Sequence, residues 1–144
     1  MSDDELKTRM RASFDRLAAD YDSAGCFVHF GRRLVEAVGV EPGQRVLDVA
    51  SGIGAVLFPA AEEAGPTGSV VGVDLSAEMA RLANAEAERR GVAARVQVMD
   101  AEHLHFGDHT FDRVLCGFGL MFLPRLDQAM AELRRVLEPG GALG

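Results

Sequence analysis

The segment from residue 44 to 137 alternates short apolar runs with helical patterns, and this alternation constrains the fold more than any other feature. Four runs predict buried strands, namely QRVLDVA (44–50), SVVGVD (69–74), RVQVMD (95–100) and FDRVLCG (111–117). Helical patterns occupy 55–64, 77–90 and 126–137. Strands that alternate with helices predict an α/β fold, with a doubly wound, Rossmann-like parallel sheet between two helical layers.

Two further helices are predicted before the first strand. The first has an apolar face at helical spacing, formed by Leu6, Met10, Phe14, Leu17 and Tyr21, and the second runs from Cys26 to Val38. The first also carries basic residues among acidic ones, which predicts a solvated face: Lys7, Arg9, Arg11 and Arg16. We therefore expect one domain over 1–144, with a helical leader at 1–41 and a core at 42–144.

Composition narrows the classes of partner and location. The net charge of −7 disfavours nucleic acid and anionic membranes, because both attract cationic surfaces. Cys26 and Cys116 have neither disulfide-framework nor metal-site spacing, and no apolar run approaches the length of a membrane span. These features predict a cytoplasmic protein without a bound metal.

Three successive strands end in, or close to, an aspartate: Asp48, Asp74 and Asp100. The carboxyl ends of parallel strands meet at one rim of the sheet, where open α/β folds bind ligands. Asp74 lies at the distance from the preceding glycine loop at which a carboxylate reaches ribose hydroxyls in dinucleotide folds. A nucleoside ligand is therefore expected.

The loop Ala50-Ser51-Gly52-Ile53-Gly54 indicates which nucleoside is expected. It matches the dinucleotide fingerprint incompletely, and the carboxylate of Asp48 would oppose a pyrophosphate at this place. A ligand with an ammonium group would instead gain from that carboxylate. S-adenosylmethionine combines adenosine with an amino-acid end and has no phosphate.

The chain resembles class I S-adenosylmethionine-dependent methyltransferases of the small-molecule subgroup that includes the ubiquinone/menaquinone biosynthesis methyltransferases. The resemblance covers nearly the whole chain. It is carried by RVLDVASGIG, VVGVDLSAEMARLA, VQVMDAEHLHF, FDRVLCGFGLMFL and AMAELRRVLEPGG, and by the leader segment FDRLAADYD.

The resemblance implies a set of residues around S-adenosylmethionine. Asp48, Ala50, Ser51, Gly52 and Gly54 are expected at the methionine part, Asp74 at the ribose, Leu75, Met79, Asp100 and Ala101 at the adenine, Cys116 and Gly117 near the methyl group, and Tyr21 over the cofactor. The chain departs from the family at Ala50, where glycine is usual. A methyl group there is compatible with the loop if φ is negative.

Other candidate residues are less specific. His29 and the loop histidines His103, His105 and His109 have no metal-ligand spacing, and His29 is a candidate general base only through its expected place near the rim. Cys116 has no base spaced to activate it as a nucleophile. Two interpretations stay open for Phe118, Met121 and Phe122: a wall of the acceptor site, or core beneath the last helix.

The sequence ends at PGGALG, where a fifth strand of the family sheet is expected to begin. We therefore expect the last strands to be missing and the strand at 111–117 to expose an apolar edge. A fragment, a homo-oligomer that pairs these edges and a shortened domain all agree with this. The predicted function is in-line methyl transfer to a small molecule; the alternatives are a non-catalytic S-adenosylmethionine-binding module and an NAD-dependent oxidoreductase.

Overall fold

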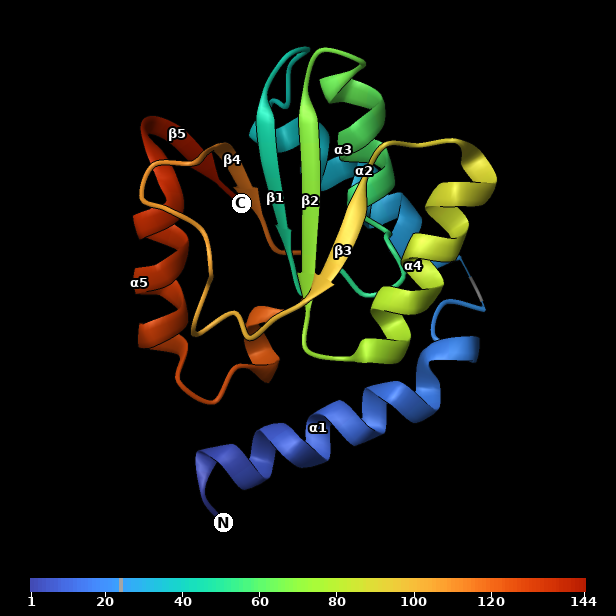
Figure 1. Cartoon of the computed structure of the whole chain (residues 1–144), viewed down its shortest axis with the longest axis vertical. Helices are drawn as coiled ribbons and strands as arrows, with labels where there is room; N and C mark the ends of the chain where they lie inside the picture. The colour runs from blue at the N-terminus through green and yellow to red at the C-terminus, as the bar shows by residue number, and fades with distance from the viewer. Residues whose placement is uncertain (24) are drawn as a thin grey trace.

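A computed structural model describes residues 1–23 and 25–144, in which helices and strands alternate as expected (Figure 1). The helices are α1 (Asp3–Leu17), α2 (Cys26–Val38), α3 (Leu57–Ala64), α4 (Ala77–Arg90) and α5 (Leu126–Val136), with short 3-10 turns η1 (Ala18–Asp20) and η2 (Leu120–Phe122). The strands are β1 (Arg45–Val49), β2 (Ser69–Asp74), β3 (Arg95–Val98), β4 (Phe111–Leu115) and β5 (Leu137–Leu143).

The five strands form one parallel sheet in the order β3-β2-β1-β4-β5. The strand order reverses between β1 and β4, which makes this the topological switch point of a doubly wound sheet. The register aligns Asp48 of β1 with Gly72 and Leu115 of the neighbouring strands, and Asp74 with Val98. The Rossmann-like α/β prediction is confirmed.

Two hydrophobic clusters fill the space on either side of the sheet. One joins Val46, Val70 and Leu115 of the strands to α2, α3 and α4, and the other joins Leu47, Val73 and Val114 to α5 and the loop after β3. Successive strand residues point to opposite faces, so Val46 and Leu47 belong to different clusters. The result is a three-layer α/β/α core.

The end of the chain corrects the prediction that the fifth strand is missing. The last helix stops at Val136, and β5 pairs with β4 from Leu137 to Leu143. The turn-like Pro139-Gly140-Gly141 lies in an irregularity, because the pairing moves from Phe111–Leu137 to Arg113–Ala142. Proline and glycine are tolerated at such a bulge on an edge strand. The sheet edges are therefore β3 and β5, and β4 is an interior strand.

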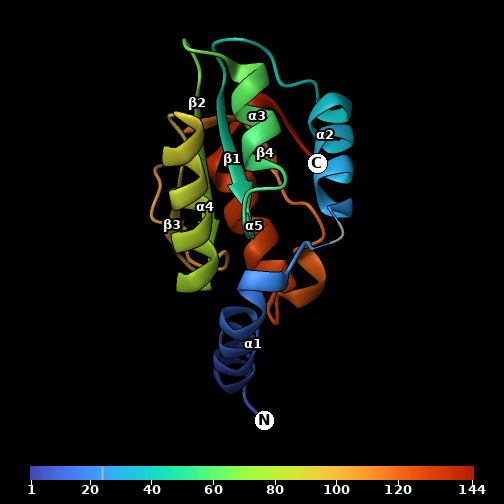
Figure 2. The same ribbon diagram turned by 90° about the vertical axis from the view of Figure 1, so that its right-hand side faces the viewer.

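Helix α1 lies outside the three layers, across the carboxyl ends of the strands (Figures 1 and 2). Its N-terminus is capped by Ser2 and Glu5 in a capping box. The buried residue of α1 is Lys7, whereas Arg9, Arg11 and Arg16 are exposed. The predicted solvated basic face is therefore wrong for Lys7, because carboxylates at the rim of the sheet surround that ammonium group.

Within residues 1–23 and 25–144, no helix combines the length and the apolar composition needed to cross a bilayer.

Candidate functional site

A cleft lies between α1 and the carboxyl ends of the strands at the switch point. Its empty volume is about 1040 Å³ when the open solvent at the cleft is included. Segments far apart in the chain line it: α1, the loop after β1, and the residues that follow β2, β3 and β4. Of the site residues predicted from sequence, those in its lining are Tyr21, Ala50, Ser51, Gly52, Asp74, Leu75, Met79, Asp100, Ala101 and Gly117. Asp48, Gly54 and Cys116 lie outside this lining.

The loop after β1 turns through left-handed backbone at three positions. The φ angles are +54° at Ala50, +54° at Gly52 and +101° at Gly54. The condition of negative φ at Ala50 is therefore not met, and its methyl group occupies a conformation that favours glycine. Gly119 accommodates that methyl group, since a Cβ on Gly119 would lie 2.4 Å from the Cβ of Ala50.

Three amides of this loop already have acceptors in the protein. The N–H of Ser51 donates to the Val73 carbonyl (3.0 Å), that of Gly54 to the Ser51 carbonyl (3.0 Å), and that of Gly52 to Oδ2 of Asp74 (2.8 Å). A pyrophosphate site uses such amides as donors, and here a carboxylate occupies the central one. The expected contact with a ligand carboxylate is therefore restricted to the remaining amides of the loop.

Asp48 is buried directly behind the loop. Its Oδ2 accepts a hydrogen bond of 2.6 Å from the Ser51 hydroxyl. Of these two residues, Ser51 lines the cleft and Asp48 does not. Among the buried side-chain polar atoms described, Asp48 Oδ1 alone has no hydrogen-bond partner. Burial raises the pKa of Asp48 to about 7, and the nearby charge of Asp74 adds to this effect. The site thus holds an under-satisfied acceptor that a cationic group would stabilise.

Asp74 ends β2 at the centre of the rim. Its two oxygens accept hydrogen bonds of 2.8 Å from the backbone amides of Gly52 and Ser76. Burial nevertheless raises the pKa of Asp74, because the cleft lining is largely apolar. The carboxylate is fixed by these two bonds and retains acceptor capacity toward the cleft.

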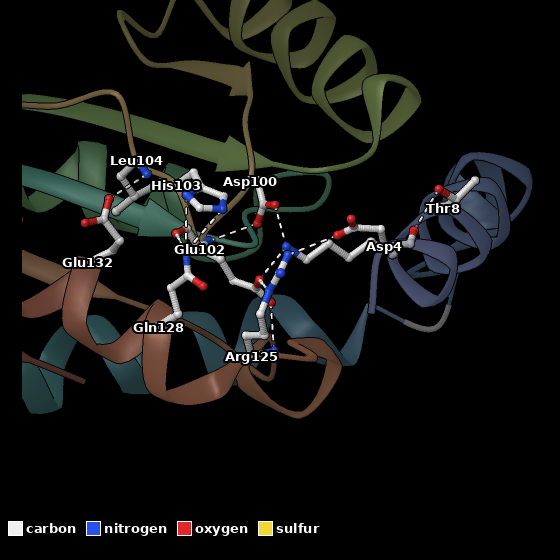
Figure 3. A network of polar contacts seen from close by, with 10 residues as sticks. Asp4, Thr8, Asp100, Glu102, His103, Leu104, Arg125, Gln128 and Glu132 are labelled. Atoms are coloured by element: carbon white, nitrogen blue, oxygen red, sulfur yellow. Dashed lines mark hydrogen bonds and ion pairs between the residues drawn. The ribbon is translucent and has the colours of Figure 1, made fainter. Parts of the chain in front are cut away.

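Asp100 belongs to a charged network that the sequence did not reveal (Figure 3). Lys7 contacts Oδ2 of Asp100 at 2.6 Å and also contacts Glu102, whose side chain is fully buried. Arg125 donates to Glu102 from its side chain (2.7 Å) and its backbone (2.9 Å), and it pairs with Asp4 of α1 (3.1 Å). The segment Asp100–His105 carried no periodicity that marked Glu102 as an interior residue.

Aromatic side chains form a connected wall at the cleft, and all of them except Phe30 belong to its lining. Neighbouring rings contact one another in the order Phe122–Phe14–Tyr21–Phe27–Phe118–Phe30, with centroids 5.1–6.0 Å apart. Phe118 has φ +62°, a strained conformation for a bulky residue that is typical of functional sites. Phe118 and Phe122 line the cleft and are 49% and 39% exposed, so the interpretation as core beneath the last helix is wrong for both.

The histidines do not enter this cleft. His29, His103, His105 and His109 are exposed, and none belongs to its lining. The structure therefore does not place His29 where a base for a cleft-bound acceptor would be needed. Burial raises the pKa of the Cys116 thiol to about 12, which keeps this thiol protonated at neutral pH.

Comparison with known proteins assigns the family. A family model described as "Methyltransferase domain" matches residues 46–141, which include all five strands as far as the bulge in β5. This chain belongs to the methyltransferase domain family. The resemblance seen in its motifs is confirmed by this match and by the relatives below.

The curated relatives of this methyltransferase domain have names that refer to small molecules. The chain is 38% identical to aklanonic acid methyltransferase DauC from Streptomyces sp. (strain C5), over 99% of the chain and 66% of that protein. It is 35% identical to the ubiquinone/menaquinone biosynthesis C-methyltransferase UbiE of Cupriavidus metallidurans, over 98% of the chain and 60% of that protein. The chain thus spans about two thirds or less of the length of these relatives.

Solved structures share the fold of this methyltransferase domain. A SAM-dependent methyltransferase from Aquifex aeolicus superposes with a TM-score of 0.71 at 25% sequence identity, covering 76% of this chain and 58% of that one. This likeness agrees with the doubly wound sheet described above.

Proposed function

We propose that this domain binds S-adenosylmethionine in the cleft and transfers its methyl group to a small-molecule acceptor. One observation carries the proposal: the central amide of the glycine loop, at Gly52, donates to the carboxylate of Asp74 instead of facing a phosphate. Two carboxylates at the loop, one of which occupies its central amide, suit a nucleoside without phosphate groups and disfavour NAD. The names of the relatives and of the structural neighbour support the same cofactor and reaction.

The residues present fit the chemistry of this cofactor. Asp74 would accept from the ribose hydroxyls, and Leu75 and Met79 would pack against the adenine. The under-satisfied carboxylate of Asp48, reached through Ser51, favours an ammonium group over an anion at the loop. Tyr21 covers the loop, because its ring lies 3.9 Å from the position of a Cβ on Gly52.

S-adenosylmethionine, when bound, supplies an electrophilic methyl group on a good leaving group, and the protein mainly has to align an acceptor and exclude water. Tyr21 and Phe14, whose rings are 6.0 Å apart, shield the cleft from solvent on the side of α1. The histidines lie outside the lining and Cys116 is protonated, so proton transfer from the acceptor falls to water or to a carboxylate of the rim.

The aromatic wall supports a planar, largely apolar acceptor. Phe27 and Phe118 present ring faces and edges that favour stacked or edge-to-face contact with another ring. The same proposal includes a cytoplasmic location, which the free thiols of Cys26 and Cys116 support.

Calorimetry with S-adenosylhomocysteine and NAD tests the cofactor assignment on the chain itself. We expect saturable binding of S-adenosylhomocysteine and none of NAD at the same concentrations. The variant Asp74→Ala removes the ribose acceptor and should weaken nucleoside binding by roughly tenfold or more. Binding of NAD alone would overturn the proposal.

Acceptor screening tests the second half of the proposal. Hydroxylated naphthalenes and saturated bicyclic alcohols of the same size form a matched pair, and release of S-adenosylhomocysteine reports turnover. We expect turnover only with the aromatic members and a rise in their KM in Phe118→Ala. Equal turnover of the saturated alcohols would exclude recognition by the aromatic wall.

A further inference from the structure

Lys7 is the buried residue of α1, and its ammonium group lies between two carboxylates at the end of the sheet. Its Nζ contacts Oδ2 of Asp100 at 2.6 Å and Oε2 of Glu102. Burial opposes the charge of Lys7, yet the hydrogen bonds and charges of both partners raise its pKa. The ammonium group therefore bridges Asp100 and Glu102 in its charged form.

The two ends of this bridge have different surroundings. Glu102 is fully buried and already receives two hydrogen bonds from Arg125, so a cation stabilises it from the side of α5. Asp100 lines the cleft, as Lys7 does, and its other oxygen accepts from the Glu102 amide at 2.9 Å. Lys7 is thus the cationic side chain that holds Asp100 at the cleft.

We propose that Lys7 is a positioning residue: it orients Asp100 as the acceptor for the exocyclic amine of the nucleoside, and so links the docking of α1 to recognition of adenine. This rests on the proposed binding of S-adenosylmethionine. The ligand feature recognised in this way is a donor N–H on the base, which needs an acceptor oxygen of Asp100 held in the right direction.

Electrostatics gives the physical reason. Two carboxylates that contact the same nitrogen atom repel each other once that nitrogen is removed. Other charged groups do not replace the ammonium group of Lys7. Arg11 lines the cleft, but it has no contact with Asp100 among the described ion pairs and hydrogen bonds. Asp74 adds negative charge, and Arg125 contacts Glu102 but not Asp100. Without Lys7, this repulsion turns the carboxylate of Asp100 away from Glu102, and its oxygens are no longer held toward the base.

Docking of α1 does not depend on Lys7 alone. Near the other end of the helix, Oδ1 of Asp15 accepts from the Ser76 hydroxyl (2.5 Å) and the Glu78 amide (3.2 Å), at the start of α4. Asp4 pairs with Arg125. A variant at Lys7 therefore keeps α1 attached at two further points, which allows its effect on recognition to be measured in a folded protein.

The test compares two ligands that differ at one group of the base. S-adenosylhomocysteine carries the amine, and its deaminated analogue S-inosylhomocysteine carries an oxygen at that position. Calorimetry gives the affinity ratio for the wild type, Lys7→Met, Lys7→Arg and Arg125→Met. Arg125→Met is the matched control. Arg125 is the other cation that contacts Glu102, but it neither lines the cleft nor contacts Asp100.

We expect the wild type to prefer S-adenosylhomocysteine by roughly tenfold or more, because an unmet charged hydrogen bond is costly. Lys7→Met should bring the ratio to within about threefold of unity, Lys7→Arg should restore part of it, and Arg125→Met should leave it unchanged. An undiminished ratio in Lys7→Met, an equal loss in Arg125→Met, or no preference in the wild type would overturn the inference. Failure of the wild type to bind either nucleoside would instead overturn the proposed function.

Discussion

The two leading helices are attached to the molecule by different forces. Helix α2 buries Gly31 and Val35 against the core, and a Cβ on Gly31 would lie only 2.0 Å from the carbonyl oxygen of Ala55. Helix α1 buries a lysine. It is held by ion pairs and hydrogen bonds through Asp4, Lys7 and Asp15 and by the ring contact of Phe14 with Phe122 (5.1 Å).

This difference gives the two helices different roles: α2 contributes to the stability of the fold, and α1 contributes to the cleft. Close backbone packing and apolar burial make α2 part of the cooperative core. Exposed charged contacts are weaker and depend on salt, so we expect α1 to open locally more easily than α2. Four predictions follow from the comparison, from the largest expected effect to the smallest.

Adding a methyl group to α2 should destabilise the whole fold. Gly31→Ala places a Cβ against the backbone of Ala55, which cannot move aside as a flexible side chain would. We expect the free energy of unfolding in urea to fall by about 3 kcal/mol. Ala37→Val adds bulk to the exposed face of the same helix and should have little effect. An unchanged midpoint in Gly31→Ala would mean that α2 is not packed as described.

Lowering the pH from 8 to 5 should stabilise the core and leave the α1 contacts in place. Burial raises the pKa of Asp48 to about 7, so the folded state binds a proton that the unfolded chain releases. The free energy of unfolding should therefore rise by roughly 2 kcal/mol as the pH falls through this window, and Asp48→Asn should flatten the profile.

Glu102 provides the contrast in the same titration. Hydrogen bonds from Lys7 and Arg125 outweigh burial and lower its pKa below the ordinary value of 4.5. Its contribution to stability is complete above that value and is lost only as the pH falls further, through its folded pKa. Loss of α1 protection between pH 8 and 5, measured by hydrogen exchange after correction for intrinsic rates, would contradict this.

Added salt should make local opening of α1 easier and leave local opening of α2 unchanged. Raising NaCl from 0.1 to 1 M screens the exposed Asp4–Arg125 pair, while the partly buried contacts of Lys7 are affected less. We expect local opening of α1 to become slightly easier, seen as faster hydrogen exchange. The amides of α2 serve as the internal control, and equal acceleration of both helices would remove the distinction between them.

The loop after β1 should become slightly more stable when Ala50 is replaced by glycine. Ala50→Gly relieves a φ of +54°, and we expect stabilisation of about 0.5 kcal/mol with no loss of S-adenosylhomocysteine affinity. Ala61→Gly in α3 makes the same chemical change at ordinary helical backbone and should destabilise the protein. Destabilisation by both substitutions would show that the Ala50 methyl contributes more through packing than it costs through strain.

Local patterns were enough to predict the elements and much of the rim. The strand and helix periods predicted α2 with its observed bounds, and four of the strands within a few residues. Aspartates near the ends of successive strands pointed to one rim, because parallel strands carry their carboxyl ends to the same side. The family motifs then indicated the residues around the cleft, most of which line it.

Contacts between distant segments decided the rest. The sequence placed Lys7 on a solvated face and gave no sign that Glu102 is interior, since the partners of both lie elsewhere in the chain. It favoured a missing fifth strand, because Pro139-Gly140-Gly141 has the composition of a turn and only pairing with β4 reveals the bulged strand.

The sequence by itself determined the alternation of strands and helices, the doubly wound fold and the acidic rim, because each follows from the spacing of nearby residues. Only the tertiary structure decided which charges meet, that Asp48 lies behind Ser51, that Ala50 has a positive φ and that the histidines stay outside the cleft. Burial, pKa and side-chain pairing depend on distances between segments that the chain brings together only when it folds.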